Sequence, residues 1–183
     1  MRSIVNDMLF LARADQGEAA TGLVQTPVAP EIGKTIEFLE FVLDESQETV
    51  KIDGNTHTEA MIEIALFRRA MANLLQNAIE HSRPGAQILV NIEEQPSLIR
   101  IAVSNPGKPI AAVHLPLLFD RFYRVDAARH NGTIQGHGLG LAIVKAVATM
   151  HGGGVFASSA NGITTIGFSV LKTSRTVDSS ASA

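Results

Sequence analysis

The stretch Gly136-His137-Gly138-Leu139-Gly140-Leu141 opens an apolar-periodic segment that we expect to be helical to about His151. Alternating glycines, which have no Cβ, let a backbone pass close to a bulky ligand. The first N–H groups of the helix that follows, and its positive dipole end, form a site for phosphate. A flexible glycine turn leading into a core helix fits this stretch equally well, so the rest of the chain has to decide between the two.

The composition is that of a globular protein. With 183 residues, of which 45% are hydrophobic and 18% charged, the chain suits one domain with a short appendage. The formal net charge of −3 gives no reason to expect nucleic acid or an anionic membrane as the main partner. The absence of cysteine excludes disulfides, thiolate metal sites and cysteine nucleophiles. No apolar run approaches the ~20 residues of a membrane span, and no signal-peptide pattern opens the chain, so we expect it to be soluble.

The N-terminal segment, residues 1–16, has apolar residues at three- and four-residue spacing and is predicted to be a helix. Such a short helix is unstable alone, so it either packs on the body or is the end of a longer, oligomeric helix. The small residues of 17–22 form a predicted linker, residues 23–171 the main domain, and the small polar residues of 172–183 a disordered tail.

Alternating and periodic patterns predict the elements of the main domain. Strands are expected at 23–28, 49–52, 87–93, 98–104, 153–159 and 163–171, and helices at 32–43 and 59–79 and after the glycine stretch. The prolines and glycine of 105–109 predict a loop, and the polar residues 124–135 a lid. Helices grouped apart from hairpin-connected strands indicate a two-layer α/β (α+β) sandwich.

Asn73 and Asn77 are four residues apart on the long predicted helix and therefore share a face. Asparagines in the interior of a helix are poor helix formers, so the presence of two on one face calls for a structural or functional explanation. Both amides could satisfy buried backbone groups or face water. Alternatively, an amide oxygen ligates Mg²⁺, an ion that proteins usually hold through few groups plus nucleotide phosphates.

Asn105 follows a strand, and its amide oxygen could accept a hydrogen bond from an adenine amino group. Alternatively, Asn105 belongs to an ordinary turn with an Asx cap.

Four motifs in order resemble those of sensor histidine kinases. Asn73-Leu74-Leu75-Gln76-Asn77-Ala78 resembles their N box, the segment from Val103 to Ile110 their first glycine box, Leu118-Phe119-Asp120-Arg121-Phe122-Tyr123-Arg124 their F box, and residues 136–141 their second glycine box. The stretch from Gly162 to Thr165 resembles a degraded third glycine box, and residues 1–16 resemble the end of the family's dimerisation and phosphoacceptor domain. The glycine-box and F-box variants are most similar to those of kinases that sense heavy metals such as copper, silver or zinc.

The resemblance implies a Bergerat ATP-binding fold, a mixed and mostly antiparallel sheet covered on one face by helices, with ATP and Mg²⁺ as ligands. It implies that Asn77 ligates Mg²⁺, that Asn73 supports the phosphate side, and that Asn105 reads adenine where the family more often has Asp. The other implied nucleotide contacts are His81, Gly107, Ile110, Phe119, Phe122, Arg124, Gly136, Gly138, Leu139, Gly140, Leu141 and Thr165.

Besides Asn105, three further positions depart from the family's pattern. Glu80 stands where a phosphate-facing Lys or Arg is common, and Pro109 replaces the second glycine of its box. His81, at a position that is often aromatic, either stacks on adenine or is a surface histidine. Of the basic residues near the site, Lys108, Arg121, Arg124 and Arg129, only Arg124 is predicted to contact phosphate.

The implied activity is transfer of the γ-phosphoryl group of ATP to a histidine on the dimerisation domain, for onward transfer to a response regulator. None of the six histidines resembles the acceptor box, so we expect a catalytic portion that does not phosphorylate itself, belonging to a homodimeric kinase of the inner membrane and lying on its cytoplasmic side. The alternatives are an ATPase of the gyrase and Hsp90 type, whose general base would be a glutamate where this chain has Asn73, and an interaction module without nucleotide.

Overall fold

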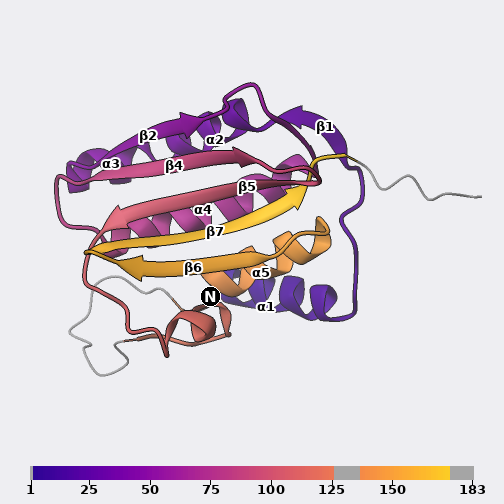
Figure 1. The fold of residues 1–183 in the computed structure, drawn as a ribbon. Helices are drawn as coiled ribbons and strands as arrows, with labels where there is room; N and C mark the ends of the chain where they lie inside the picture. Colours follow the sequence, from indigo (N-terminus) through magenta and orange to yellow (C-terminus); the bar gives the residue numbers. More distant parts are fainter. Residues whose placement is uncertain (1, 126–136, 174–183) are drawn as a thin grey trace, which may run out of the picture.

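A five-stranded mixed sheet forms the front layer of the molecule in the computed structural model, which describes residues 2–125 and 137–173 (Figure 1). Its strand order is β2 (Thr49–Gly54), β4 (Gln87–Glu94), β5 (Leu98–Pro106), β7 (Ile163–Leu171) and β6 (Val155–Ala160). β2 and β4 are parallel, and the other three pairs are antiparallel. The predicted two-layer sandwich with a mostly antiparallel sheet is therefore confirmed.

Helices cover one face of this sheet, behind it in Figure 1. They are α2 (Val28–Phe38), α3 (Glu40–Ser46), α4 (Ile64–His81) and α5 (Gly140–Met150). Along β5 every second side chain is buried, which is the pattern of a strand with one covered face. The rings of Phe67 on α4 and Phe168 on β7 lie 5.7 Å apart between the two layers. The core thus lies between the sheet and α4 and α5.

β1 (Val24–Pro27) and β3 (Glu59–Ile62) form a separate antiparallel pair. We expected residues 59–62 to begin the long helix, and that expectation is wrong. Ala60 and Ile62 are buried at the two-residue spacing of a strand. The helix begins at Ile64 because the Glu63 carboxylate caps it, accepting hydrogen bonds from the N–H groups of Ala65 and Leu66.

The helix expected at 32–43 is two helices, α2 and α3, which meet at Leu39. α2 also begins earlier than expected, at Val28, and includes Pro30 in its first turn. A proline is tolerated there because the first N–H groups of a helix have no partner within the helix.

The end of β5 differs from expectation as well. Asn105 and Pro106, expected in a loop, pair with Thr164 and Ile163 of β7. The pairing of β5 with β4 ends at Ser104, so β5 has only one neighbour beyond that residue. A proline without an N–H is compatible with such an edge.

α1 (Arg2–Asp15) confirms the predicted N-terminal helix and packs against α5. Leu11 is 1% exposed and belongs to the core. Asp7 pairs with Arg69 of α4, with 2.6 Å between carboxylate and guanidinium. The helix is therefore docked on the body.

Two predicted segments lie largely outside the described residues, namely the lid beyond Val125 and the tail from residue 174 onward. Lys172, at the start of the predicted tail, is held by an ion pair of 2.5 Å with Glu94. None of the helices in the described part of the chain combines the length and apolar character that a bilayer span requires.

Candidate functional site

Gly107 lies where three elements meet at one end of α4. Its N–H donates to the carbonyl of Gly162 in the β6–β7 turn over 2.9 Å, and it forms an antiparallel bridge with Ser82, just after α4. A Cβ on residue 107 would lie 2.6 Å from the carbonyl oxygen of His81, closer than real Cβ atoms approach. Glycine therefore lets the end of β5 meet the end of α4.

Asn105 precedes this junction and is 4% exposed. Its Nδ2 donates one long hydrogen bond, 3.4 Å, to the carbonyl of Pro106. Within the described residues, no hydrogen bond to its Oδ1 is observed. The amide oxygen is thus not used as an acceptor by any described residue.

A set of hydroxyl groups fixes the segment after Gly107 to β6 and β7. The N–H of Ile110 donates to Ser159 Oγ over 3.0 Å, and Ser159 Oγ lies 3.2 Å from Thr164 Oγ1. Ser104 Oγ and Thr165 Oγ1 are 2.7 Å apart. Of these residues, sequence reasoning named only Ile110 and Thr165, because strand alternation indicates the side of a strand but not the partner.

The two asparagines of α4 have different environments. Asn73 Nδ2 donates to the carbonyl of Arg69 over 2.8 Å, and a Cβ on Gly140 would lie 2.8 Å from Asn73 Oδ1. Asn73 therefore lies directly against the start of α5. Asn77, one turn later and half-buried, makes no side-chain hydrogen bond to any described residue.

The second glycine box is packed against the F box. The carbonyl of Gly138 accepts a hydrogen bond of 2.8 Å from the N–H of Phe122. Gly138 has φ +68°, and a Cβ there would lie 2.8 Å from Phe122 Cα, so only glycine fits. α5 begins at Gly140 without a side-chain cap. No side chain among the described residues is seen to cap its first N–H groups. Leu139 is buried and Leu141 half-buried beside them.

The aromatic residues of the F box differ in exposure. Phe119, at the end of η1 (Leu115–Phe119), is 6% exposed and belongs to the core. Phe122 is 59% exposed and has φ +63°. Such a backbone costs of order 1–3 kcal/mol for a residue with a side chain, and such strain clusters at functional sites.

The remaining predicted contacts are placed as follows. His81 and Glu80 are exposed at the end of α4, and Arg124 is half-buried. Gly136 lies outside the described residues. Asn73, Asn77 and His81 follow one side of α4 over two turns, about 12 Å at 1.5 Å per residue. The structure thus joins the two glycine boxes by a line of side chains on α4.

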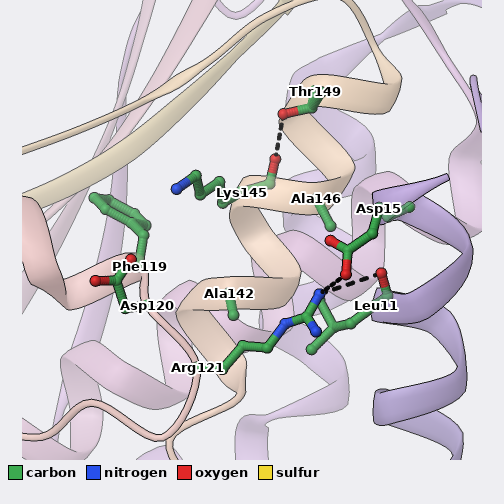
Figure 2. A pocket seen from close by; sticks show the side chains of 10 residues that line it. Leu11, Asp15, Phe119, Asp120, Arg121, Ala142, Lys145, Ala146 and Thr149 are labelled. Carbon is green, nitrogen blue, oxygen red and sulfur yellow. Dashed lines mark hydrogen bonds and ion pairs between the residues drawn. The ribbon is translucent and has the colours of Figure 1, made fainter. Parts of the chain in front are cut away.

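Arg121, one of the basic residues near the predicted site, pairs with α1. Its guanidinium lies 2.6 Å from the carboxylate of Asp15 and donates to the carbonyl of Leu11 over 3.3 Å (Figure 2). This contact closes one side of an open pocket of about 320 Å³, which α5 lines with Lys145 and Thr149. The pocket lies between α1, α5 and the F box.

His151 was missed as a positioning residue. Its Nδ1 donates to the carbonyl of Val147 over 2.8 Å, and its Nε2 accepts from the N–H of Glu63 over 3.0 Å. The imidazole thereby joins the end of α5 to the start of α4. A histidine after a helix gives no sequence signal for this role.

No cluster of three or more histidine and carboxylate side chains in the described part of the chain could hold a metal ion.

Residues 62–174 match the family of histidine kinase-, DNA gyrase B- and HSP90-like ATPases. The chain belongs to this family. Its domain is the ATPase-type catalytic domain found in sensor kinases, which confirms the relationship that the four motifs predicted.

Curated relatives include heavy-metal sensor kinases. The chain is 40% identical over 159 residues to sensor histidine kinase CusS of Escherichia coli (strain K12). The aligned region covers 87% of this chain and 33% of CusS. The chain is 35% identical over 156 residues to sensor protein CzcS of Cupriavidus metallidurans, covering 85% of this chain and 32% of CzcS. The chain thus spans about a third of the length of these relatives.

A solved structure supports the fold. Full-length ShkA, crystallised in complex with AMPPNP, matches with a TM-score of 0.80 at 20% identity, over 94% of this chain and 36% of ShkA. At this identity the likeness shows the fold alone. The α+β fold of histidine kinase catalytic domains, predicted from the sequence, is thereby confirmed.

Proposed function

We propose that this domain binds ATP with Mg²⁺ along α4 and donates the γ-phosphoryl group to a histidine of a dimerisation and phosphoacceptor domain. The observation that carries the proposal is the half-buried side chain of Asn77. It makes no hydrogen bond to the described residues and lies on α4 between the Gly107 junction and the uncapped start of α5.

Asn77 fits an Mg²⁺ ligand, since its amide oxygen is of the hard type that this ion prefers and is not engaged by any described residue. The lack of a carboxylate cluster among the described residues suits an ion held mainly by phosphates and water. Bound Mg²⁺ would neutralise phosphate charge during transfer. Asn73, already fixed by its bond to Arg69, would support the phosphate side.

At the base end, Asn105 Oδ1 would accept from the adenine amino group, and Gly107 would allow the ring to approach. Ile110 and Phe119 would wall the pocket, with His81 and Thr165 beside it. At the phosphate end, the N–H groups of residues 138–141 would contact the phosphates, with Gly136, Phe122 and Arg124 on the lid side. Dipoles at a helix start favour such an anion.

The transfer step needs no covalent nucleophile on this domain. The bond between the γ-phosphorus and the β–γ bridging oxygen breaks, a P–N bond to the acceptor imidazole forms, and ADP leaves. Catalysis is then positioning and charge neutralisation. We propose that residues 23–171 are the catalytic unit, that residues 1–16 belong to the dimerisation helix, and that residues 17–22 link them.

In this proposal the parent protein is a homodimeric inner-membrane kinase. The domain lies on its cytoplasmic side, and a response regulator receives the phosphoryl group. The family and the sensor-kinase relatives support it.

The test is a calorimetric titration of the chain with ATP, with and without Mg²⁺. We expect Mg²⁺-dependent binding that Asn77→Ala weakens at least about tenfold, or ~1.4 kcal/mol. Gln76→Ala is the matched control, because Gln76 is the exposed neighbour on the same helix and should bind like the parent. With radiolabelled ATP we expect no label on the chain itself.

Other outcomes would overturn the assignment. Rapid ATP turnover by the isolated chain, lost in Asn73→Ala, would indicate a hydrolytic ATPase. No binding by the parent chain would indicate an interaction module. Label on one of the six histidines would contradict the expected need for a separate acceptor domain.

A further inference from the structure

The corner where α2 meets α3 exposes two large aromatic side chains. Phe38 is 79% exposed and Phe41 80%, the highest values among the large apolar residues of the described chain. Both flank Leu39, which is 3% exposed and anchors the corner in the core. The corner lies behind the sheet, on the side of the edge strand β2 (Figure 1). The rings are thus presented to solvent on a fixed support.

Exposed acidic residues flank these phenylalanines in the sequence. They are Glu37, Glu40, Asp44 and Glu45, and no basic residue occurs between Lys34 and Lys51. Neither α2 nor α3 has a basic residue in its last turn, where the helix dipole favours one. Acidic residues at the C-terminal ends of two helices oppose the helix dipoles, and the same short stretch exposes aromatic rings to water. Such departures from the usual local preferences are expected at binding surfaces.

At two other places in the molecule, a phenylalanine and a carboxylate contact the same arginine. Arg69 lies 4.2 Å over the ring of Phe10 while it pairs with Asp7. Arg100 lies 4.0 Å over the ring of Phe156 while it pairs with Glu93. In both, a phenylalanine and a carboxylate hold one guanidinium.

The corner has the phenylalanines and carboxylates of this arrangement but lacks the guanidinium. None of the ring contacts formed among the described residues involves Phe38 or Phe41.

We propose that the corner is a docking surface for an arginine-bearing segment of a partner protein. The faces of Phe38 and Phe41 receive guanidinium groups, and the carboxylates of Glu37, Glu40 and Asp44 accept their N–H bonds. Arginine suits this surface better than lysine because its planar, weakly hydrated group stacks on rings and pairs with carboxylates at the same time. The surface is separate from the residues proposed to bind nucleotide.

The experiment uses three labelled peptides of equal length, in which four leucines alternate with arginine, with lysine or with glutamine. Their binding to the whole chain is measured by fluorescence anisotropy at physiological salt, and the site is mapped by amide NMR shifts. We expect the arginine peptide to bind at least about threefold more tightly than the lysine peptide, with the glutamine peptide weakest. The shifts should centre on residues 37–45.

The double variant Phe38→Ser/Phe41→Ser should weaken the arginine peptide about tenfold and abolish its preference over lysine. Both side chains are exposed, so the variant should keep the parent's unfolding midpoint and ATP affinity. Val113→Ser, which changes a 70% exposed residue elsewhere, is the matched apolar control. The double variant Glu40→Gln/Asp44→Asn should bind the arginine peptide more weakly and with a smaller dependence on salt concentration. Glu59→Gln on β3 should change neither.

If the arginine and lysine peptides bound equally and the phenylalanine changes had no effect, binding would be a non-specific attraction of positive charge to the carboxylates. That result would overturn the proposal. Shifts centred elsewhere would overturn it too. Self-association of the chain without peptide, lost in Phe38→Ser/Phe41→Ser, would assign the surface to a second copy instead.

Discussion

His151 forms two hydrogen bonds that require a neutral imidazole, since Nδ1 donates to Val147 and Nε2 accepts from Glu63. Burial disfavours its charged form and lowers its pKa from 6.5, although the bond to Val147 and the nearby Glu63 carboxylate act in the opposite direction. A proton on Nε2 would also remove the acceptor for the Glu63 N–H. Protonation therefore opposes the junction of α4 and α5.

Stability should accordingly fall as the pH falls below about 6.5. In that range the unfolded chain binds a proton that the folded chain does not, so the free energy of unfolding decreases until the lowered pKa is reached. His151→Gln keeps a donor and an acceptor without titrating, and we expect a flatter profile in urea unfolding between pH 7.5 and 5.5. His57→Gln, at an exposed histidine, should retain the parent's slope. An equal slope in His151→Gln would contradict this account.

At the scale of elements, the contact between Gly138 and Phe122 ties the second glycine box to the F box. Gly138→Ala would force a Cβ to 2.8 Å from Phe122 Cα at φ +68°. We expect a loss of about 1–3 kcal/mol in unfolding free energy and at least about tenfold weaker ATP binding, because the loop must move. Thermal unfolding and calorimetry measure the two effects.

The matched control is Gly33→Ala in α2. A Cβ on residue 33 meets no atom within 4 Å, and its φ is not positive. Alanine in a helix interior should stabilise the fold by about 0.5–1 kcal/mol and leave ATP binding unchanged. If both substitutions had the same effect, the close approach at Gly138 would not matter.

Elements with long periodic patterns could be predicted from the sequence, whereas their junctions could not. α4 and the β4–β5 hairpin follow from the spacing of their apolar residues. Residues 59–62 were expected in the helix because they directly precede its apolar pattern, whereas their pairing with β1 makes them a strand. Pro106 is tolerated in β5 because the pairing with β4 stops at Ser104, and the sequence does not reveal where that pairing stops.

The candidate site shows the same division. The four motifs predict roles for Asn77 and Gly107, since residue type and order are visible in the sequence. The hydrogen bond of Asn73 to Arg69, the hydroxyl groups of Ser104 and Ser159, and the pairing of Arg121 with Asp15 depend on which elements meet. Periodicity carries no information on such partners.

On the scale of the whole molecule, the F box connects α1 to the second glycine box. Arg121 binds Asp15 and the carbonyl of Leu11 on α1, and the next residue, Phe122, donates to the carbonyl of Gly138. A displacement of α1 would therefore act on the backbone that holds the glycine box. What holds α1 in place then matters for the site.

Leu11 is the principal anchor of α1, because it is 1% exposed while the Asp15 side chain that pairs with Arg121 is 62% exposed. Leu11→Ala should lower the opening free energy of α1 by about 2–4 kcal/mol, measured by hydrogen exchange of its amides, whereas Asp15→Asn should cost at most about 1 kcal/mol. Leu9→Ala is the control on the opposite face, 57% exposed, and should leave exchange unchanged. Equal effects of Leu9→Ala and Leu11→Ala would show that burial does not dock α1.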